Sequence, residues 1–291
     1  MLLANWVLAA RPATLWASVA PVLVGTAISL DDGAFRIDVF VTALIAATAI
    51  QIGVNFANDL ADAARGVDNT ERIGPPRAVS SGLIASRQMQ MGVGAAFGVA
   101  AVMGSYLATV AGPIVLAIGV ASFIAALGYT NGPYPYGYKG LGELFVFIFF
   151  GLVATAGMRF VYDGQITARA WFAGVVMGFL ATAILIANNV RDAETDKASN
   201  KRTLAVILGD RWARILYVAV LSAAYATVLF AVTVDAFEPL TLLTLAAMPL
   251  AVTPVRIVLV CSDGPQLITA LKETARLQIV TAMLLAVGLL A

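Results

Sequence analysis

The side chains best placed to do chemistry in this sequence are asparagines and aspartates in two separate stretches, each at the end of a long apolar segment. On a helix each set falls on one face, because its members recur three to four residues apart. The sets are Asn55, Asn58, Asp59 and Asp62 in the first stretch, and Asn188, Asp192 and Asp196 in the second. Carboxylates at the end of a membrane-embedded helix cost free energy unless something binds them. The spacing therefore predicts two acidic helix ends that hold a cation.

The rest of the composition narrows the kind of cation. The 291 residues include no histidine and a single cysteine, Cys261. Histidine acid–base chemistry, histidine metal ligands and an intrachain disulfide are therefore excluded. A metal must bind to oxygen ligands, which favours Mg²⁺, Mn²⁺ or Ca²⁺. The formal net charge of +1 gives no indication of nucleic-acid binding, and we expect none.

Basic residues beside both acidic stretches indicate which ligand binds the cation together with the protein. Mg²⁺ usually keeps several waters and shares its shell with phosphate oxygens, and Arg and Lys suit the remaining phosphate charge. The natural ligand is a diphosphate with its apolar part among the helices, a description that fits an isoprenyl diphosphate. Mg²⁺ and the cations would stabilise the departing diphosphate, and a dry cavity would protect an allylic carbocation from water. The neighbouring cations are Arg72, Arg77, Lys197, Lys201 and Arg202.

Two further stretches each allow two interpretations. The loop YTNGPYPYGYKGLGE, residues 129–143, suits either an aromatic belt at the membrane interface or a cover over a substrate. The phenylalanine run FVFIFFG, residues 145–151, suits either a lipid-facing or packed surface or the wall of an apolar tunnel. Arg159, beyond this run, is interpreted as an interfacial residue that snorkels toward water.

The elements that position these residues are apolar. The chain is 60% hydrophobic and 12% charged, with a mean hydropathy of +0.90, whereas soluble domains are about 25% charged. Segments near the roughly 20 residues needed to cross a bilayer recur along the whole chain. We predict an all-α polytopic membrane protein, a bundle of nine transmembrane helices in one domain over residues 1–291. The predicted helices cover about 13–30, 39–58, 88–108, 113–130, 141–161, 171–190, 213–233, 239–258 and 273–290.

Loop charge predicts how this bundle lies in the membrane. Fifteen of the 18 Lys and Arg residues fall on the side of the N-terminus, and only Arg36, Arg159 and Arg169 fall on the other. Basic residues concentrate in cytoplasmic loops. We therefore expect the N-terminus and both acidic helix ends at the cytoplasmic side. The first residues lack the basic region and cleavage site of a secretory signal peptide, so the first apolar helix is expected to be retained.

Four segments carry a resemblance to a known family. They are ARPATLWASVAPVLVGTA (10–27), NDLADAARGVDNTERIGPPRAVSSGLI (58–84), PYPYGYKGLGELFVFIFFG (133–151) and NNVRDAETDKASNKRTLAVILG (188–209). The two aspartate motifs resemble those of the UbiA-type membrane prenyltransferases. YGYKGLGE and RDAETDKASNKRTLAVILG are similar to the branch that prenylates 1,4-dihydroxy-2-naphthoate in menaquinone synthesis. Beyond residue 209 the chain is compatible only in hydropathy.

The resemblance implies a nine-helix bundle with its active site at the cytoplasmic side of a bacterial inner membrane. It implies transfer of a chain from polyprenyl diphosphate to the naphthoate ring, with loss of CO₂ and pyrophosphate. Matching positions imply that Mg²⁺-diphosphate is bound by Asp59, Asp62, Asp68, Asp192 and Asp196, supported by Asn58 and Asn188. Candidate diphosphate contacts are Arg72, Arg77, Lys139, Lys197, Lys201 and Arg202. Arg11 and Asn55 would contact the aromatic acid, although Ala13 and Trp16 depart from the family pattern there.

Other functions remain as alternatives at this point. A UbiA-type enzyme could use another aromatic acceptor, such as 4-hydroxybenzoate or homogentisate. A cation-coupled transporter would also place acids in a membrane, but its ion sites usually lie near the midplane within repeated halves. Here the acids fall at helix ends, and the sequence has no wide internal repeat. Prenyl chain length and oligomeric state do not follow from the sequence.

Overall fold

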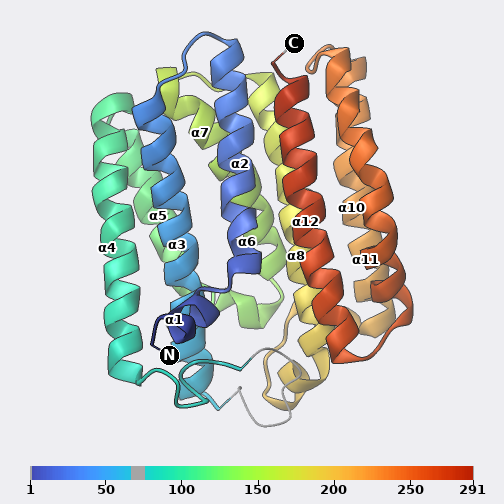
Figure 1. Ribbon diagram of the computed structural model, residues 1–291. Coiled ribbons are helices and arrows are strands. Elements are labelled where there is room, and N and C mark those ends of the chain that lie inside the picture. The colour runs from blue at the N-terminus through green and yellow to red at the C-terminus, as the bar shows by residue number, and fades with distance from the viewer. Residues whose placement is uncertain (1, 67–75, 291) are drawn as a thin grey trace.

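The computed structural model describes residues 2–66 and 76–290, and within these ranges the chain is helical and contains no strand (Figure 1). Two predicted site residues, Asp68 and Arg72, lie outside the described residues. The helices are α1 (Leu2–Ala10), α2 (Pro12–Asp31), α3 (Ile37–Ala64), α4 (Ser86–Ala111), α5 (Ile114–Gly128), η1 (Tyr136–Lys139), α6 (Gly142–Val146), η2 (Phe147–Val153), α7 (Ala154–Asp163), α8 (Ala168–Ala198), α9 (Leu204–Leu208), α10 (Asp210–Thr233), η3 (Pro239–Ala247), α11 (Met248–Val260) and α12 (Gly264–Gly288).

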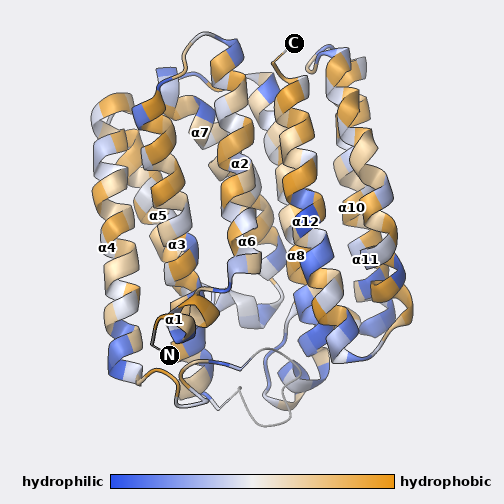
Figure 2. Cartoon of the chain, viewed as in Figure 1, coloured by the Kyte–Doolittle hydropathy of each residue, from blue (hydrophilic) through white to orange (hydrophobic). Residues whose placement is uncertain are grey.

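Each predicted apolar segment coincides with a helix or a continuous helical run, and seven of these in the described ranges are long and apolar enough to cross a membrane. Figure 2 shows hydrophobic residues along most of the bundle, with hydrophilic ones gathered toward its lower end. Helix α5 has only 15 residues, and α12 carries Lys272, Glu273 and Arg276 within it. The prediction of an all-helical membrane protein is confirmed. That α5 and α12 also cross the membrane remains a prediction.

Two features of the helices were not predicted. A short helix, α1, precedes the first span, and Arg11 joins it to α2 with a positive φ of 51°. The predicted segment 141–161 is one helical run, but its middle, η2, is a π-helix. Such stretches are rare and occur frequently at functional sites.

The two acidic stretches lie at the ends of unusually long helices. Helix α3 has 28 residues and α8 has 31, so they extend about 42 and 46 Å, against a hydrocarbon thickness of about 30 Å. Both end at the end of the bundle where α2 begins, the lower end in Figure 1. We call this the acidic end of the bundle, and the other the opposite end.

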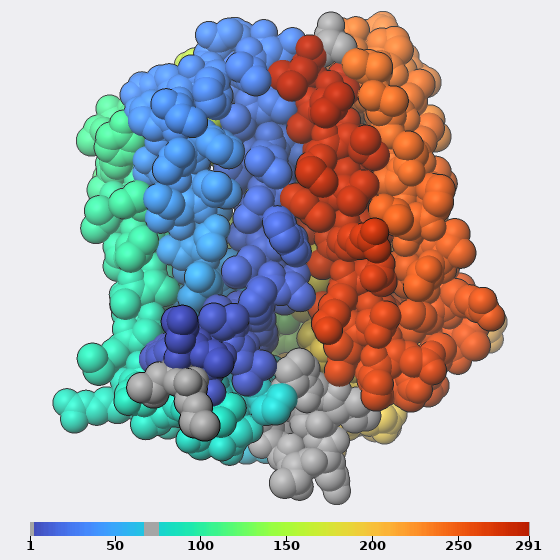
Figure 3. All heavy atoms as spheres, in the orientation of Figure 1, coloured from blue at the N-terminus to red at the C-terminus, as the bar shows by residue number. Residues whose placement is uncertain are grey.

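The two halves of the bundle differ in how they are filled. The largest core cluster draws most of its buried side chains from α8, α10 and α12, together with part of α2. Helices α10 and α12 are also joined by buried hydroxyl pairs, Tyr217–Thr274 at 2.7 Å and Tyr225–Thr281 at 3.0 Å. Figure 3 shows α2 beside α12 on one face, with α1 at the lower end. The half built from α3, α4, α5 and α7 instead holds a cavity.

Helix α8 and the π-helical stretch approach each other closely through glycine. A Cβ added to Gly151 would lie 2.4 Å from the Cα of Gly178 and 2.6 Å from the carbonyl oxygen of Gly174. Small residues allow this close packing in a membrane bundle, where backbone contact replaces the hydrophobic effect between helices. The contact fixes the phenylalanine run against the helix that carries the second acidic stretch.

A cluster of ion pairs lies at the opposite end of the bundle. Arg159 belongs to it, so the interpretation of this residue as a snorkelling side chain is wrong. This side chain is 3% exposed and does not snorkel. It binds Asp32 through Nε at 2.8 Å and Nη2 at 2.7 Å, and it also contacts Asp163. Beside it, Arg169 binds Asp31 at 2.7 Å and donates to the carbonyl of Leu289 at 2.7 Å. These contacts tie α2, α7, α8 and the end of α12 together.

Candidate active site

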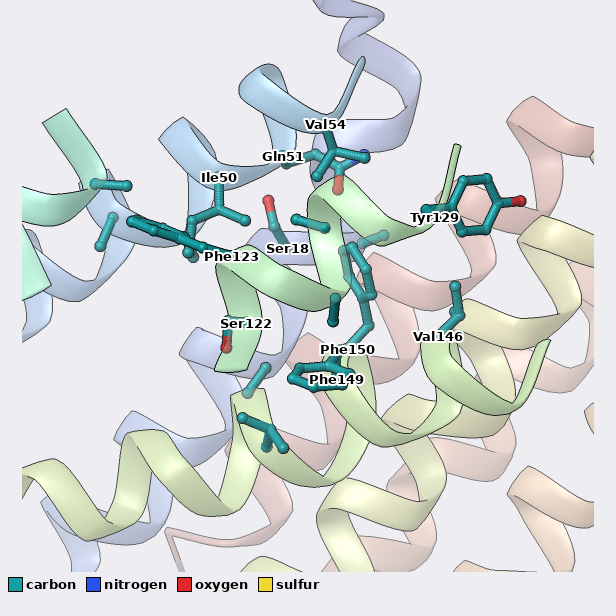
Figure 4. A pocket seen from close by; sticks show the side chains of 18 of the residues that line it. Ser18, Ile50, Gln51, Val54, Ser122, Phe123, Tyr129, Val146, Phe149 and Phe150 are labelled. Carbon is teal, nitrogen blue, oxygen red and sulfur yellow. The ribbon is translucent and has the colours of Figure 1, made fainter. Parts of the chain in front are cut away.

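A cavity of about 460 Å³ lies among α2, α3, α4, α5, the α6–α7 run and α8. Its wall is mostly apolar, and Figure 4 shows Val146, Phe149 and Phe150 around it together with Ile50 and Phe123. The phenylalanine run therefore walls the cavity at Phe145, Phe149 and Phe150, whereas Phe147 packs on Phe179 of α8. The charged lining residues Arg11, Asp62, Arg77 and Lys201 lie at the acidic end, together with the amides Asn55, Asn58 and Asn188.

Asp62 is the carboxylate of α3 that reaches this cavity. It is 2% exposed, and it receives a hydrogen bond of 2.6 Å from the Tyr138 hydroxyl and an ion pair of 3.3 Å from Arg77. Tyr138 belongs to η1, in the loop predicted either as an aromatic belt or as a cover. Its contact with Asp62 supports the cover interpretation.

Asp59 takes a different position on the same helix. It is 1% exposed, and its two oxygens accept hydrogen bonds from the backbone N–H groups of Ala78 and Val79 at 3.0 and 3.1 Å. Asp59 thereby anchors the turn that carries Arg77 toward Asp62. Asn58, one residue earlier, accepts from the Thr130 hydroxyl at 2.8 Å and so ties α3 to the end of α5.

The aspartates of the second acidic stretch also pair with basic side chains of the protein. Asp192 binds Arg191 through two contacts of 2.7 and 2.5 Å, and Arg191 donates to Asn188 at 2.8 Å. Asp196 pairs with Lys201 at 3.3 Å. Its other oxygen, Oδ2, is buried with no hydrogen-bond partner among the described residues.

Lys201 connects the two acidic stretches. Its ammonium lies 3.3 Å from Asp196 and 5.3 Å from the centre of the Tyr138 ring, whose hydroxyl binds Asp62. Burial alone would lower the pKa of this ammonium, but Asp62, Asp196 and Asp192 raise it above its ordinary value. Lys201 therefore stays charged at neutral pH, at the point where both stretches meet.

The donor set at this end fits a hard divalent cation. All the available ligands are carboxylate or amide oxygens, which Mg²⁺ prefers, and the unpaired Oδ2 of Asp196 is a buried acceptor that a cation would satisfy. Within residues 2–66 and 76–290 no three acidic side chains are close enough to hold a metal on their own. Shared coordination with phosphate oxygens is the arrangement that such an incomplete protein site suits.

The predicted acceptor residues lie at the start of α2. The side-chain amide of Asn55 donates to the Ala10 carbonyl at 2.8 Å and to the Thr14 hydroxyl at 3.0 Å. Gln51, one turn earlier, also reaches Thr14, at 3.3 Å. Asn55 thus fixes the sharp connection between α1 and α2, where Arg11 adopts its left-handed conformation and lines the cavity.

Three of the predicted diphosphate contacts lie away from the cavity. Lys139 is exposed and its ammonium sits 5.7 Å from the centre of the Tyr134 ring. Lys197 and Arg202 are exposed as well, and none of the three lines the cavity. Tyr138 and Arg191 were not predicted from the sequence as partners of Asp62 and Asp192. The contact of Arg191 could have been predicted, since Arg191 directly precedes Asp192 in the sequence. For Tyr138 the only indication was the large number of tyrosines in its loop.

One further buried pair was missed. Glu143, 6% exposed, accepts a hydrogen bond of 2.9 Å from the side-chain amide of Asn189, and its second oxygen has no partner among the described residues. The pair joins the end of the tyrosine-rich loop to α8, one residue from Asn188. No spacing in the sequence connects these two positions.

Comparison with known proteins agrees with this architecture. Residues 18–290 match the model of the UbiA prenyltransferase family. Proteins named 1,4-dihydroxy-2-naphthoate octaprenyltransferase are similar over most of the chain. The one from Mycobacterium tuberculosis is 38% identical, covering 97% of this chain and 96% of that protein. The one from Bacillus subtilis is 31% identical, covering 96% and 90%.

Solved structures share the fold. A UbiA homolog from Aeropyrum pernix K1 has a TM-score of 0.68 at 15% identity, covering 94% of this chain and 96% of that one. A UbiA homolog from Archaeoglobus fulgidus, bound to DMAPP and Mg²⁺, has a TM-score of 0.67 at 14% identity, covering 97% and 99%. The resemblance seen in the sequence is confirmed. Because the family model and the relatives span nearly its whole length, this chain belongs to the UbiA prenyltransferase family.

Proposed function

We propose that this protein transfers a polyprenyl chain from polyprenyl diphosphate to 1,4-dihydroxy-2-naphthoate, with loss of CO₂ and pyrophosphate. The product is the quinol form of demethylmenaquinone, which places the reaction in menaquinone biosynthesis. The observation that carries the proposal is one cavity with a charged end and a long apolar wall. Its charged end suits a diphosphate and its wall suits an isoprenoid chain. The names of the similar bacterial proteins support the naphthoate as acceptor.

The proposed reaction balances without an added oxidant or base. The allylic carbon–oxygen bond breaks, and pyrophosphate leaves with the electron pair. The ring carbon that bears the carboxylate attacks the allylic carbon. The carboxylate then leaves as CO₂, and its bonding electrons restore the aromatic ring. The apolar wall, including Phe149 and Phe150, keeps water from the cationic carbon.

The residues at the acidic end would hold the diphosphate and its metal. We assign Mg²⁺-diphosphate binding to Asp59, Asp62, Asp68, Asp192 and Asp196, assisted by Asn58 and Asn188. Mg²⁺ would neutralise the charge that develops on the leaving diphosphate. Lys201 and Arg77, which line the cavity, are the cations best placed to contact its oxygens. Arg72, Lys139, Lys197 and Arg202 are further candidate contacts of the diphosphate.

The acceptor would bind at the start of α2. Arg11 lines the same cavity as Asn55, and its guanidinium suits the naphthoate carboxylate through paired hydrogen bonds. The hydroxyl and amide groups of Thr14 and Gln51 are near enough to Asn55 to complete a polar pocket. We assign acceptor recognition to this group.

We further propose how the protein lies in its membrane. It would be a single domain of nine transmembrane helices in a bacterial inner membrane, with α5 and α12 as the two spans beyond the seven apolar ones. The distribution of Lys and Arg favours a cytoplasmic N-terminus and a cytoplasmic acidic end. Family membership favours this enzyme over a cation-coupled transporter.

An acceptor panel tests the function. The purified protein with Mg²⁺ and octaprenyl diphosphate is incubated separately with 1,4-dihydroxy-2-naphthoate, 4-hydroxybenzoate and homogentisate, and products are identified by mass. A decarboxylated, prenylated product from the naphthoate alone is expected. Preference for either other acceptor would transfer the proposal to that branch of the family, and the absence of any product would remove it.

A further inference from the structure

We propose that three glycines in the apolar part of the cavity set the longest prenyl chain that the protein accepts. They are Gly104 of α4, Gly119 of α5 and Gly157 of α7, and all three line the cavity. The inference rests on the proposed function, because it concerns the isoprenoid part of the same substrate.

The cavity follows the bundle over most of its length. Along α3 its lining runs from Asp62 to Ala43. These positions are nineteen residues apart, or about 28 Å on a helix, close to the thickness of a bilayer core of about 30 Å. At the opposite end the lining includes Val22, Leu107 and Met158, which belong to a buried apolar cluster. A chain anchored by its diphosphate at Asp62 would therefore extend toward that cluster.

The three glycines lie in the distal part of this path. Gly119 is five residues after the start of α5, Gly157 is six residues before the end of α7, and Gly104 is seven residues before the end of α4. All three helix ends are at the opposite end of the bundle (Figure 1). Each glycine is therefore within about 11 Å of that end along its helix. Only a long chain would reach them.

The space beside these glycines is not needed for helix packing. A Cβ added at Gly104, Gly119 or Gly157 would meet no described atom within 4 Å. At Gly151, by contrast, it would meet the backbone of α8 at 2.4 Å. Glycine is also the least favourable residue in a helix interior apart from proline. Its occurrence on three different helices around one cavity fits a requirement for room inside the cavity.

Larger side chains at these positions would occupy the path of the distal isoprene units. A geranyl chain, anchored at the acidic end, would stop short of them, whereas an octaprenyl chain would have to pass them. The predicted effect is therefore a change in the preference between long and short donors.

The test compares Gly104→Leu, Gly119→Leu and Gly157→Leu in the full-length protein, using geranyl and octaprenyl diphosphate with the naphthoate. We expect the ratio of kcat/KM for the octaprenyl donor over the geranyl donor to fall about tenfold or more. Gly98→Leu is the matched control, because Gly98 is an exposed glycine of α4 with no described atom near its Cβ position and it does not line the cavity. A ratio in all three variants equal to that of the control would overturn the inference.

Two further measurements keep the inference separate from folding and from the proposed function. An Ala, Leu and Phe series at Gly119 should lower the ratio in order of side-chain size, and an unordered series would contradict it. Thermal stabilisation by each diphosphate with Mg²⁺, without any acceptor, reports chain-length preference independently of turnover. If wild-type protein makes no prenylated naphthol, the proposed function fails. The binding comparison still decides whether the glycines set the longest prenyl chain that the protein accepts.

Discussion

Asp62 and Asp196 are carboxylates from the two acidic stretches, and both act on the charge of Lys201 at the acidic end. Asp62 is held by Tyr138 and Arg77, and Asp196 is held on one side only, by Lys201. Asp59 differs, since both of its oxygens also bind the backbone of the following turn. The aspartates proposed to bind metal-diphosphate thus divide into one that also shapes the site, Asp59, and others that do not.

This division predicts different outcomes for the same chemical change. Asp196→Asn should reduce kcat by about a hundredfold or more, because it removes a charge that binds the metal-diphosphate. It should cost less stability than Asp59→Asn, because Asp62 and Asp192 still attract Lys201. Asp59→Asn should lose activity and also about 1–3 kcal/mol of stability, because the new amide cannot accept both backbone hydrogen bonds. Turnover assays and thermal unfolding in the same detergent would measure both effects. Equal stability losses in the two variants would refute the division.

At the level of elements, the contact between η2 and α8 determines where the cavity wall lies. The backbone of Gly151 packs directly on Gly178, so Phe149 and Phe150 are held at a fixed distance from the helix that carries Asp192. Both phenylalanines belong to the π-helical stretch, and both line the cavity.

A glycine substitution tests this packing. Gly151→Ala should destabilise the protein by about 1–3 kcal/mol, because the added Cβ overlaps the α8 backbone. Gly94→Ala on α4 is the control, since no described atom lies near its Cβ position, and alanine there should be neutral or stabilising by up to about 1 kcal/mol. Thermal unfolding would compare them. A Gly151→Ala protein as stable as the Gly94→Ala protein would show that the helices are not in close contact.

Local patterns in the sequence predicted the helices and the faces that carry Asn55 to Asp62 and Asn188 to Asp196, because hydropathy and helical periodicity act over short distances. Partners far apart in the chain could not be predicted in this way. Tyr138 is 76 residues from Asp62, and Asp32 is 127 residues from Arg159. Arg159 was wrongly interpreted as a snorkelling residue. Its partner Asp163, four residues later on the same helix, was a local signal that was overlooked, whereas no local signal reveals Asp32.

The whole molecule combines a tightly packed half with a hollow one. The half around α8, α10 and α12 is filled by the largest core cluster, whereas the half around α3 to α5 and α7 surrounds the cavity. The ionic cluster of Arg159 and Arg169 joins these halves at the end away from the site. A hollow bundle needs such a fixed closure, because side chains do not fill its centre.

The cluster should therefore contribute to global stability. Arg159→Met should lower the stability by about 1–3 kcal/mol, less than for a fully buried ion pair because Asp32 and Asp163 are partly exposed. Arg36→Met, which breaks an exposed pair with Asp38 at the same end, should have little effect. Thermal unfolding of both variants in lipid nanodiscs would compare them. An Arg159→Met protein that unfolds at the wild-type temperature would contradict this role.

The fate of the carboxylate shows whether the protein joins the prenyl chain to the ring carbon that carries this group. Purified protein is incubated with Mg²⁺, octaprenyl diphosphate and 1,4-dihydroxy-2-naphthoate that carries ¹³C in its carboxylate, and labelled CO₂ and prenylated product are measured together. Equal amounts of the two are expected, and no CO₂ when the prenyl diphosphate is omitted. A prenylated product that retains the label, or CO₂ release without prenyl transfer, would contradict this expectation.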